Sequence, residues 1–232
     1  MKRLAIAFLA LLLPSAAAPP RVLILGDSIY MQPSQQAANL LKGIVEIVRP
    51  NNPEAFNTTT ALASLDELLG DGKWDLIHFN YGLGDLVHRA PGMKSFRVMP
   101  RKAGGIPATG PAEYEAKLTA IVERLKSTRA KLVWASTTPI RGGSNGLYEP
   151  GSEVAYNAIA AKVMAAHSIP VNDMHASVSA MLDKEKQAAP ADPYSLGKNV
   201  SIHPPLVRAI CLSLALPIPP GADTRPEPLG RR

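Results

Sequence analysis

Residues 21–30 read Arg-Val-Leu-Ile-Leu-Gly-Asp-Ser-Ile-Tyr and contain the first predicted strand with the turn that follows it. The four consecutive apolar residues 22–25 include two β-branched side chains, which predicts a short strand buried on both faces. Gly26 ends the apolar run, and Asp27 and Ser28 follow where the chain leaves the sheet. Ligands of open α/β sheets bind outside the carboxyl ends of the strands, so Ser28 is a candidate exposed nucleophile. The alternative interpretation is that Asp27 or Ser28 caps the following helix.

Composition and the chain ends predict one exported domain. The 232 residues are 46% hydrophobic and 19% charged, which is typical of a globular protein with one sizeable core. Two basic residues, an apolar stretch and a run of small residues predict a cleaved signal peptide over residues 1–17, and hence a periplasmic or secreted protein. We expect a single domain over residues 18–216 and a disordered, Pro-rich tail over residues 217–232. No later segment has the length and apolar character of a membrane span, so stable membrane insertion is not expected.

The charge and cysteine content exclude several classes of protein. The net charge of +6 is a mild excess, and no clustered basic helix or aromatic platform indicates nucleic-acid binding. Cys211 is the single cysteine, so no internal disulfide is expected, and its apolar helical surroundings predict a buried side chain. No group of histidine, cysteine and acidic residues has metal-ligand spacing. We therefore expect a monomer with neither a metal nor another cofactor.

Strand and helix patterns alternate along the chain. Further strands are predicted at 44–48, 75–81, 131–135 and 169–171, and helices at 35–42, 62–69, 112–126, 153–167, 178–186 and 206–216. This alternation predicts an α/β fold, a three-layer α/β/α sandwich around a parallel sheet. Five strands fit the flavodoxin-like order 2-1-3-4-5, whose switch point lies between strands one and three. That order places Ser28 beside the turn at residues 82–85.

Two long stretches carry no predicted element. The first, residues 86–110, follows the third strand and contains five Lys or Arg residues and no acidic residue. Two interpretations stay open: a lid that attracts an anionic substrate, or a solvated surface excursion. The second stretch, residues 188–199, leads into Ser-Ile-His-Pro at residues 201–204.

A serine nucleophile needs a base within hydrogen-bond reach and donors for the oxyanion. Of the five histidines, His203 is favoured because it directly precedes the last predicted helix, which Pro204 opens. His175, just after the fifth strand, is the competing candidate. The pattern puts the others in the third strand, in the long loop and at a helix end (His78, His88 and His167).

Three segments together resemble the SGNH (GDSL-type) hydrolases: Gly-Asp-Ser at 26–28, a Gly-x-x-Asp turn at 82–85 and His-Pro at 203–204. The resemblance covers roughly residues 21–216, and residues 78–85 and 134–139 are similar to a bacterial subgroup. It implies a flavodoxin-like sandwich and hydrolysis of carboxylic esters through an acyl-serine. It further implies that Ser28 is the nucleophile and supplies a backbone oxyanion donor, that His203 is the base, and that Gly82 opens the oxyanion block.

The sequence departs from the family pattern at three positions. Gly84 stands where an asparagine side chain is expected to donate to the oxyanion, and no glycine lies between residues 50 and 60. Val200 stands where the acid three residues before the histidine is expected. We therefore expect Asn80 to contribute a donor beside the two turn glycines. Asn199, Asp192 or a backbone carbonyl is expected to orient the base.

The resulting hypothesis is an exported serine esterase or acetylesterase that acts on a small-molecule or carbohydrate ester. The alternative is a catalytically weakened or inactive relative that binds an acyl or sugar ligand, because losing one oxyanion donor costs roughly 100- to 1,000-fold in rate. A flavodoxin-like phosphate or nucleotide binder is a weaker third option, since the sequence has no Gly-rich phosphate cradle.

Overall fold

The computed structural model describes residues 18–52, 55–70, 72–93, 97–142, 144–185, 193–197 and 199–222. The predicted signal peptide (1–17) and Asp192 lie outside these ranges. Within them, no helix combines the length and the apolar character needed to cross a bilayer.

The core of the protein is one parallel sheet. Its five strands pair in the order β2-β1-β3-β6-β7. The strands are β1 (Arg21–Gly26), β2 (Glu46–Val48), β3 (Leu76–Asn80), β6 (Lys131–Ala135) and β7 (Val171–Asn172). This confirms the predicted α/β fold and its flavodoxin-like strand order. Residues 22–25 and all of β3 are buried, as expected for strands covered on both faces.

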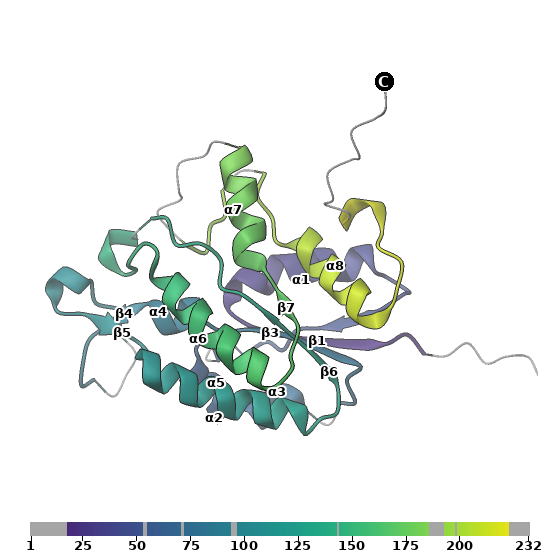
Figure 1. Cartoon of the computed structure of the whole chain (residues 1–232), viewed down its shortest axis with the longest axis horizontal. Helices are drawn as coiled ribbons and strands as arrows, with labels where there is room; N and C mark the ends of the chain where they lie inside the picture. Colours follow the sequence, from purple (N-terminus) through teal and green to yellow (C-terminus); the bar gives the residue numbers. More distant parts are fainter. Residues whose placement is uncertain are drawn as a thin grey trace, which may run out of the picture.

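Helices cover both faces of the sheet (Figure 1). One face carries α1 (Met31–Leu40) and α8 (His203–Leu214), which pack against each other. The other carries α2 (Thr58–Ala63), α3 (Leu65–Leu69), α5 (Pro111–Lys126) and α6 (Ser152–Ala166). The remaining helices are η1 (Ser28–Tyr30), α4 (Leu83–Leu86), η2 (Arg101–Ala103), η3 (Ser144–Gly146), α7 (Met174–Lys184) and η4 (Pro220–Ala222). The predicted three-layer sandwich is confirmed.

One predicted helix is divided in two. The leucine pattern over 62–69 predicted a single helix, but α2 begins earlier and α3 follows it after a break at Ser64. The earlier start has a local cause, because the side chain of Asn57 accepts a hydrogen bond from the backbone of Thr60 at 2.9 Å. Such an N-cap satisfies an amide that has no partner inside the helix.

The expectation that residues 86–110 contain no secondary structure was wrong. This segment forms an antiparallel hairpin of β4 (His88–Arg89) and β5 (Ile106–Pro107), with η2 in its connection. The backbone N–H of His88 donates to the carbonyl of Leu147 at 2.7 Å, which anchors the hairpin to the loop before α6. Figure 1 shows the hairpin beyond the carboxyl ends of the strands.

The domain also extends further than expected at its C-terminal end. Residues 217–222 were assigned to a disordered tail, but η4 contacts α8 and Ala222 is fully buried. Residues 223–232 lie outside the described residues. The predicted burial of Cys211 is confirmed, since its side chain is part of the core.

Helix α8 runs antiparallel to the strands. Near its start, the carbonyl of Pro205 accepts a hydrogen bond from the amide of Asn172, the last residue of β7, at 3.4 Å. Near its end, the carbonyl of Ser213 accepts a hydrogen bond from Lys131, the first residue of β6, at 2.8 Å. The N-terminus of α8, and with it His203, therefore lies at the carboxyl edge of the sheet. The turn after β1 leaves the sheet at this same edge.

Candidate active site

Ser28 is the first residue of η1 and its side chain is exposed at the carboxyl end of β1. The turn before it requires glycine. Gly26 has a φ of +129°, and a Cβ at this position would lie 2.0 Å from the carbonyl oxygen of Asn80. In the described part of the chain, no side chain or backbone group forms a hydrogen bond with the Ser28 hydroxyl. The hydroxyl is thus presented to solvent at the edge where ligands of such sheets bind.

Asp27 joins the turn after β1 to the turn after β3. Its buried carboxylate accepts hydrogen bonds from the backbone N–H groups of Leu83 at 3.0 Å and Gly84 at 3.2 Å. Burial, and then repulsion from Asp85, raise the pKa of Asp27 to about 8, although these two amides and Arg49 act in the opposite direction. The carboxyl group therefore fixes the turn that carries Ser28 to the start of α4, and its predicted structural role is confirmed.

Asp85 is a second buried carboxyl group in the same region. It accepts hydrogen bonds from the backbone N–H of Thr58 at 3.0 Å and from the hydroxyl of Thr58 at 2.6 Å. Burial raises the pKa of Asp85 to about 6, and the bonds from Thr58 oppose this shift. Asp85 thus ties α4 to the start of α2, which is a structural role as predicted.

At both glycines of the turn after β3, atoms of another segment lie so close that a side chain would not fit. A Cβ on Gly84 would lie 1.8 Å from the carbonyl oxygen of Phe56, and a Cβ on Gly82 would lie 1.9 Å from the hydroxyl of Thr137. Backbone from the loop before α2 therefore fills the space in which the family resemblance expects an asparagine side chain. The role of Gly82 and Gly84 in binding the oxyanion stays a prediction.

Asn80 has a different partner from the one that we expected. Its side chain is 2% exposed, and its amide donates to the carbonyl of Ala135 at 2.8 Å, which links β3 to β6. The amide is therefore already paired inside the sheet, where burial makes an unpaired donor costly. Asn80 thus links two strands through one N–H of its amide, and its role as an oxyanion donor stays a prediction.

His203 begins α8 and is half-buried. Its Nδ1 lies 2.9 Å from the hydroxyl oxygen of Ser201, and the loss of contact with water lowers the pKa of His203. Sequence reasoning missed Ser201 as an orienting residue. The signal available was a hydroxyl two residues before the histidine, at a spacing common in local turns.

Of the two residues that we predicted to orient His203, the structure describes only Asn199. Asn199 is exposed and its amide donates to the carboxylate of Glu185 at 3.2 Å. The position three residues before the histidine is occupied by Val200, which is buried in the core and is not an acid. Asp192 lies outside the described residues, and its assignment stays a prediction.

A chain of buried contacts connects the Ser28 turn to the first turn of α8. The ring of Tyr30 lies 5.6 Å from the ring of His78, and Nε2 of His78 lies 3.3 Å from the amide nitrogen of Asn172. The same amide reaches the carbonyl of Pro205. These contacts hold η1 and the start of α8 at one edge of the sheet, without a direct hydrogen bond between Ser28 and His203.

His78 lies within β3 and is fully buried, as predicted, and burial lowers its pKa to about 4. The competing candidate, His175, is the second residue of α7, and its Nε2 lies 3.2 Å from a carboxylate oxygen of the buried Glu153. Two strands, β3 and β6, separate β7 from β1. The first turn of α8 also contacts β7, so the strand order does not choose between the two histidines. Helix α8 packs against α1, which follows the Ser28 turn, and His203 as the base stays a prediction.

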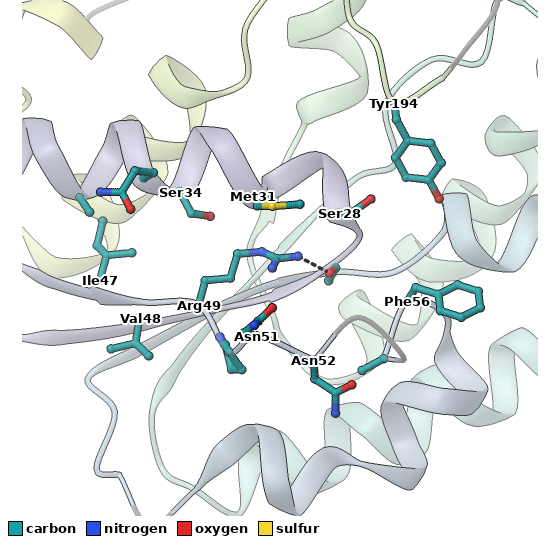
Figure 2. A pocket seen from close by; sticks show the side chains of 15 residues that line it. Ser28, Met31, Ser34, Ile47, Val48, Arg49, Asn51, Asn52, Phe56 and Tyr194 are labelled. Atoms are coloured by element: carbon teal, nitrogen blue, oxygen red, sulfur yellow. Dashed lines mark hydrogen bonds between the residues drawn. The ribbon is translucent and has the colours of Figure 1, made fainter.

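A cavity of about 690 Å³ opens beside Ser28 (Figure 2). Helix α1 forms one wall, and the end of β2 with the loop that follows it forms the other. Figure 2 shows Ser28 and Tyr194 at one end, Ile47 and Val48 at the other, and Arg49 between them. Tyr194 belongs to the segment that precedes His203 in the chain. The late part of the chain thus contributes to the same cavity as the turn after β1.

Comparison with known proteins gave matches in structure only. No family model matches the sequence. No curated protein matches it either. Similar solved structures include the acetyl xylan esterase AlAXEase, with a TM-score of 0.59, 14% identity, and coverage of 84% of this chain and 98% of that chain.

Two further solved structures with a similar fold are also ester hydrolases. A catalytic mutant of Axe2, an acetylxylan esterase from Geobacillus stearothermophilus, has a TM-score of 0.60, 16% identity, and coverage of 85% of this chain and 95% of that chain. A GDSL-like lipase from Bacteroides thetaiotaomicron has a TM-score of 0.56, 13% identity, and coverage of 84% and 89%. This chain therefore has the fold of the SGNH (GDSL-type) hydrolases, as the resemblance in its sequence predicted.

Proposed function

We propose that this protein is a serine esterase that hydrolyses a carboxylic ester through an acyl-serine intermediate. The observation that carries the proposal is the exposed Ser28 hydroxyl, placed at the mouth of the 690 Å³ cavity on the sheet edge where α8 begins with His203. Esterases and lipases with the same fold support it.

The proposed reaction begins when Ser28 Oγ attacks the ester carbonyl carbon while His203 accepts its proton. Ser201 engages Nδ1, which leaves Nε2 as the accepting atom. The backbone N–H of Ser28 donates to the oxyanion as the new C–O bond forms. The tetrahedral adduct then expels the alcohol, which takes the proton from His203. A water molecule, deprotonated by the same imidazole, cleaves the acyl-serine and releases the acid.

The finer proposal is an exported enzyme that removes a small acyl group, such as acetyl, from a carbohydrate. Two observations support it: acetylxylan esterases are among the proteins with this fold, and the cavity has room for a sugar ring. Export rests on the signal-peptide pattern of residues 1–17.

Substitution of the nucleophile tests the proposal. The wild-type protein should hydrolyse p-nitrophenyl acetate and react covalently with a fluorophosphonate probe, and Ser28→Ala should lose both reactions. Ser127→Ala, at the end of α5 and outside the cavity, is the matched control and should keep both. A wild-type protein that binds an acyl or sugar ligand with neither reaction would support the non-catalytic alternative. Equal labelling of wild type and Ser28→Ala would rule out Ser28 as the nucleophile.

A further inference from the structure

The charge of the cavity beside Ser28 is confined to one residue. Among the described residues that line it, Arg49 carries a positive charge and none is acidic. The rest of the lining is apolar or uncharged polar, including Gln35 and Asn51. None of the described basic residues of the 86–110 segment lines the cavity. A ligand that enters therefore meets a single cation and no opposing carboxylate.

Arg49 is held beside the nucleophile by backbone contacts. One terminal nitrogen of its guanidinium donates to the carbonyl oxygens of Gly26 and Asp27, each at 3.2 Å (Figure 2). These are the two residues that immediately precede Ser28. These two bonds fix the guanidinium beside the turn that carries Ser28.

Arg49 forms no direct ion pair in the described part of the chain, although the nearby carboxyl group of Asp27 interacts with its charge. No carboxylate lies within ion-pair distance of it, and its Nε is buried without a hydrogen-bond partner among the described residues. Asp27 directs its carboxylate oxygens to Leu83 and Gly84 instead. A half-buried arginine that has no direct ion pair is suited to bind the anionic group of a ligand.

We infer that this cavity recognises esters that carry a carboxylate, with Arg49 as the specificity-determining residue that binds it. The inference rests on the proposed function and names its substrate class. The carboxylate can belong to the acyl half, as in a dicarboxylic acid half-ester, or to the alcohol half, as in an acetylated uronic acid. In both cases the carbonyl carbon lies at Ser28 and the carboxylate at Arg49, two residues that line the same cavity.

Matched pairs of esters test the inference and distinguish the two sources of the carboxylate. For the acyl half, mono-p-nitrophenyl succinate is compared with p-nitrophenyl butyrate, which has the same chain length and no charge. For the alcohol half, acetylated galacturonic acid is compared with acetylated galactose. Wild type should have the lower KM for the charged member of at least one pair. Arg49→Gln should raise that KM roughly ten- to 100-fold, the scale of one hydrogen bond between charged groups.

Two further variants separate recognition from folding. Arg49→Lys keeps the charge and should recover part of the preference, without the fork geometry of arginine. Gln35→Glu leaves every contact of Arg49 intact but adds a negative charge to the cavity wall, and should also raise KM for the charged ester. Gln32→Glu adds the same charge on the same helix at an exposed position outside the cavity lining, and should have little effect.

The outcomes distinguish this inference from the proposed function. Equal changes in KM for charged and neutral esters in Arg49→Gln would overturn it, and would leave Arg49 as a support for the Ser28 turn. Direct titration of Ser28→Ala with galacturonate and galactose needs no turnover. Tighter binding of galacturonate that is lost in the Ser28→Ala, Arg49→Gln double variant would support the inference even if no ester were hydrolysed.

Discussion

Ser201 contacts the imidazole of His203 at Nδ1, where a carboxylate would stabilise the protonated ring more strongly. Its hydroxyl oxygen lies 2.9 Å from Nδ1 of His203 and 3.4 Å from the backbone nitrogen of the same residue. A hydroxyl can accept the Nδ1 proton and so fix the tautomer that leaves Nε2 as the base. It adds no negative charge to stabilise the imidazolium. The geometry thus supports a serine–histidine pair that is oriented but weakly activated.

Substitution of Ser201 should therefore change the rate more than binding. Ser201→Ala should lower kcat by roughly two- to tenfold, the scale of one neutral hydrogen bond, with KM unchanged. Ser201→Asp should raise the apparent pKa seen in the pH profile of kcat/KM, because a nearby negative charge favours the protonated imidazole. The wild-type profile should rise through a pKa below about 6.5, in line with the direction of the shift for His203. Identical profiles for all three proteins would exclude Ser201 as a positioning residue.

At the scale of elements, contacts between loops and short helices shape the edge of the sheet. The carboxylate of Asp27 binds the first turn of α4, and the carboxyl group of Asp85 binds the start of α2. The backbone of Phe56 packs directly against Gly84. These contacts hold the turns after β1, β2 and β3 against one another at the edge of the sheet where the cavity lies.

The contact between Phe56 and Gly84 predicts that a side chain at position 84 destabilises the protein. Gly84→Ala should lower the free energy of unfolding by roughly 1–3 kcal/mol, because a Cβ 1.8 Å from a carbonyl oxygen forces backbone to move. Gly84→Asn, which restores the side chain of the family pattern, should lower it at least as much. Urea unfolding measures the change. Gly221→Ala is the control, since its Cβ would meet only Leu40 at 3.8 Å. Equal stability of wild type and Gly84→Asn would refute the packing argument.

The two buried carboxyl groups predict a stability that falls as pH rises. The pKa of Asp27 is about 8 in the folded state and near 3.8 when exposed, and the pKa of Asp85 is also raised. Between these values the folded protein binds more protons than the unfolded chain, so the free energy of unfolding should decrease from about pH 4 to about pH 8. Unfolding by urea across this range measures the slope. Asp27→Asn should flatten it, and Asp66→Asn, on an exposed helix face, should not. A wild-type stability that rises over this range would contradict the prediction.

At the scale of the whole molecule, parallel topology assembles the site. Each strand ends at the same edge, and α8 returns antiparallel to the strands so that its first residue meets that edge. The turn that carries Ser28 and the first residue of α8, His203, come from opposite ends of the domain and lie at this same edge. Segment η4 then packs on α8 and closes the core at its C-terminal end.

Truncation tests the contribution of this last segment. A chain that ends at Leu216 should have a free energy of unfolding about 1–2 kcal/mol lower than a chain that ends at Ala222, because it loses the buried Ala222 and the partly buried Ile218. Thermal and urea unfolding of the two chains give the comparison. Ester hydrolysis at low temperature should be equal in both, since no residue of 217–222 lines the cavity beside Ser28. Equal stability would show that η4 is dispensable to the fold.

The class of fold, the strand order and the position of Ser28 after the first strand could be predicted from the amino-acid sequence. These depend on local patterns: the apolar run 22–25, the glycine after it and the alternation of strand and helix, all of which the backbone obeys. Local patterns did not reveal the hairpin in 86–110, whose strands are only two residues long.

The contacts of each polar group near the site could not be predicted and became visible in the folded structure. It paired Asn80 with Ala135, oriented His203 through Ser201, and placed Arg49 beside the Ser28 turn. Such partners are set by packing distances between segments that are separate in the chain, and the spacing of residues along the sequence does not encode them.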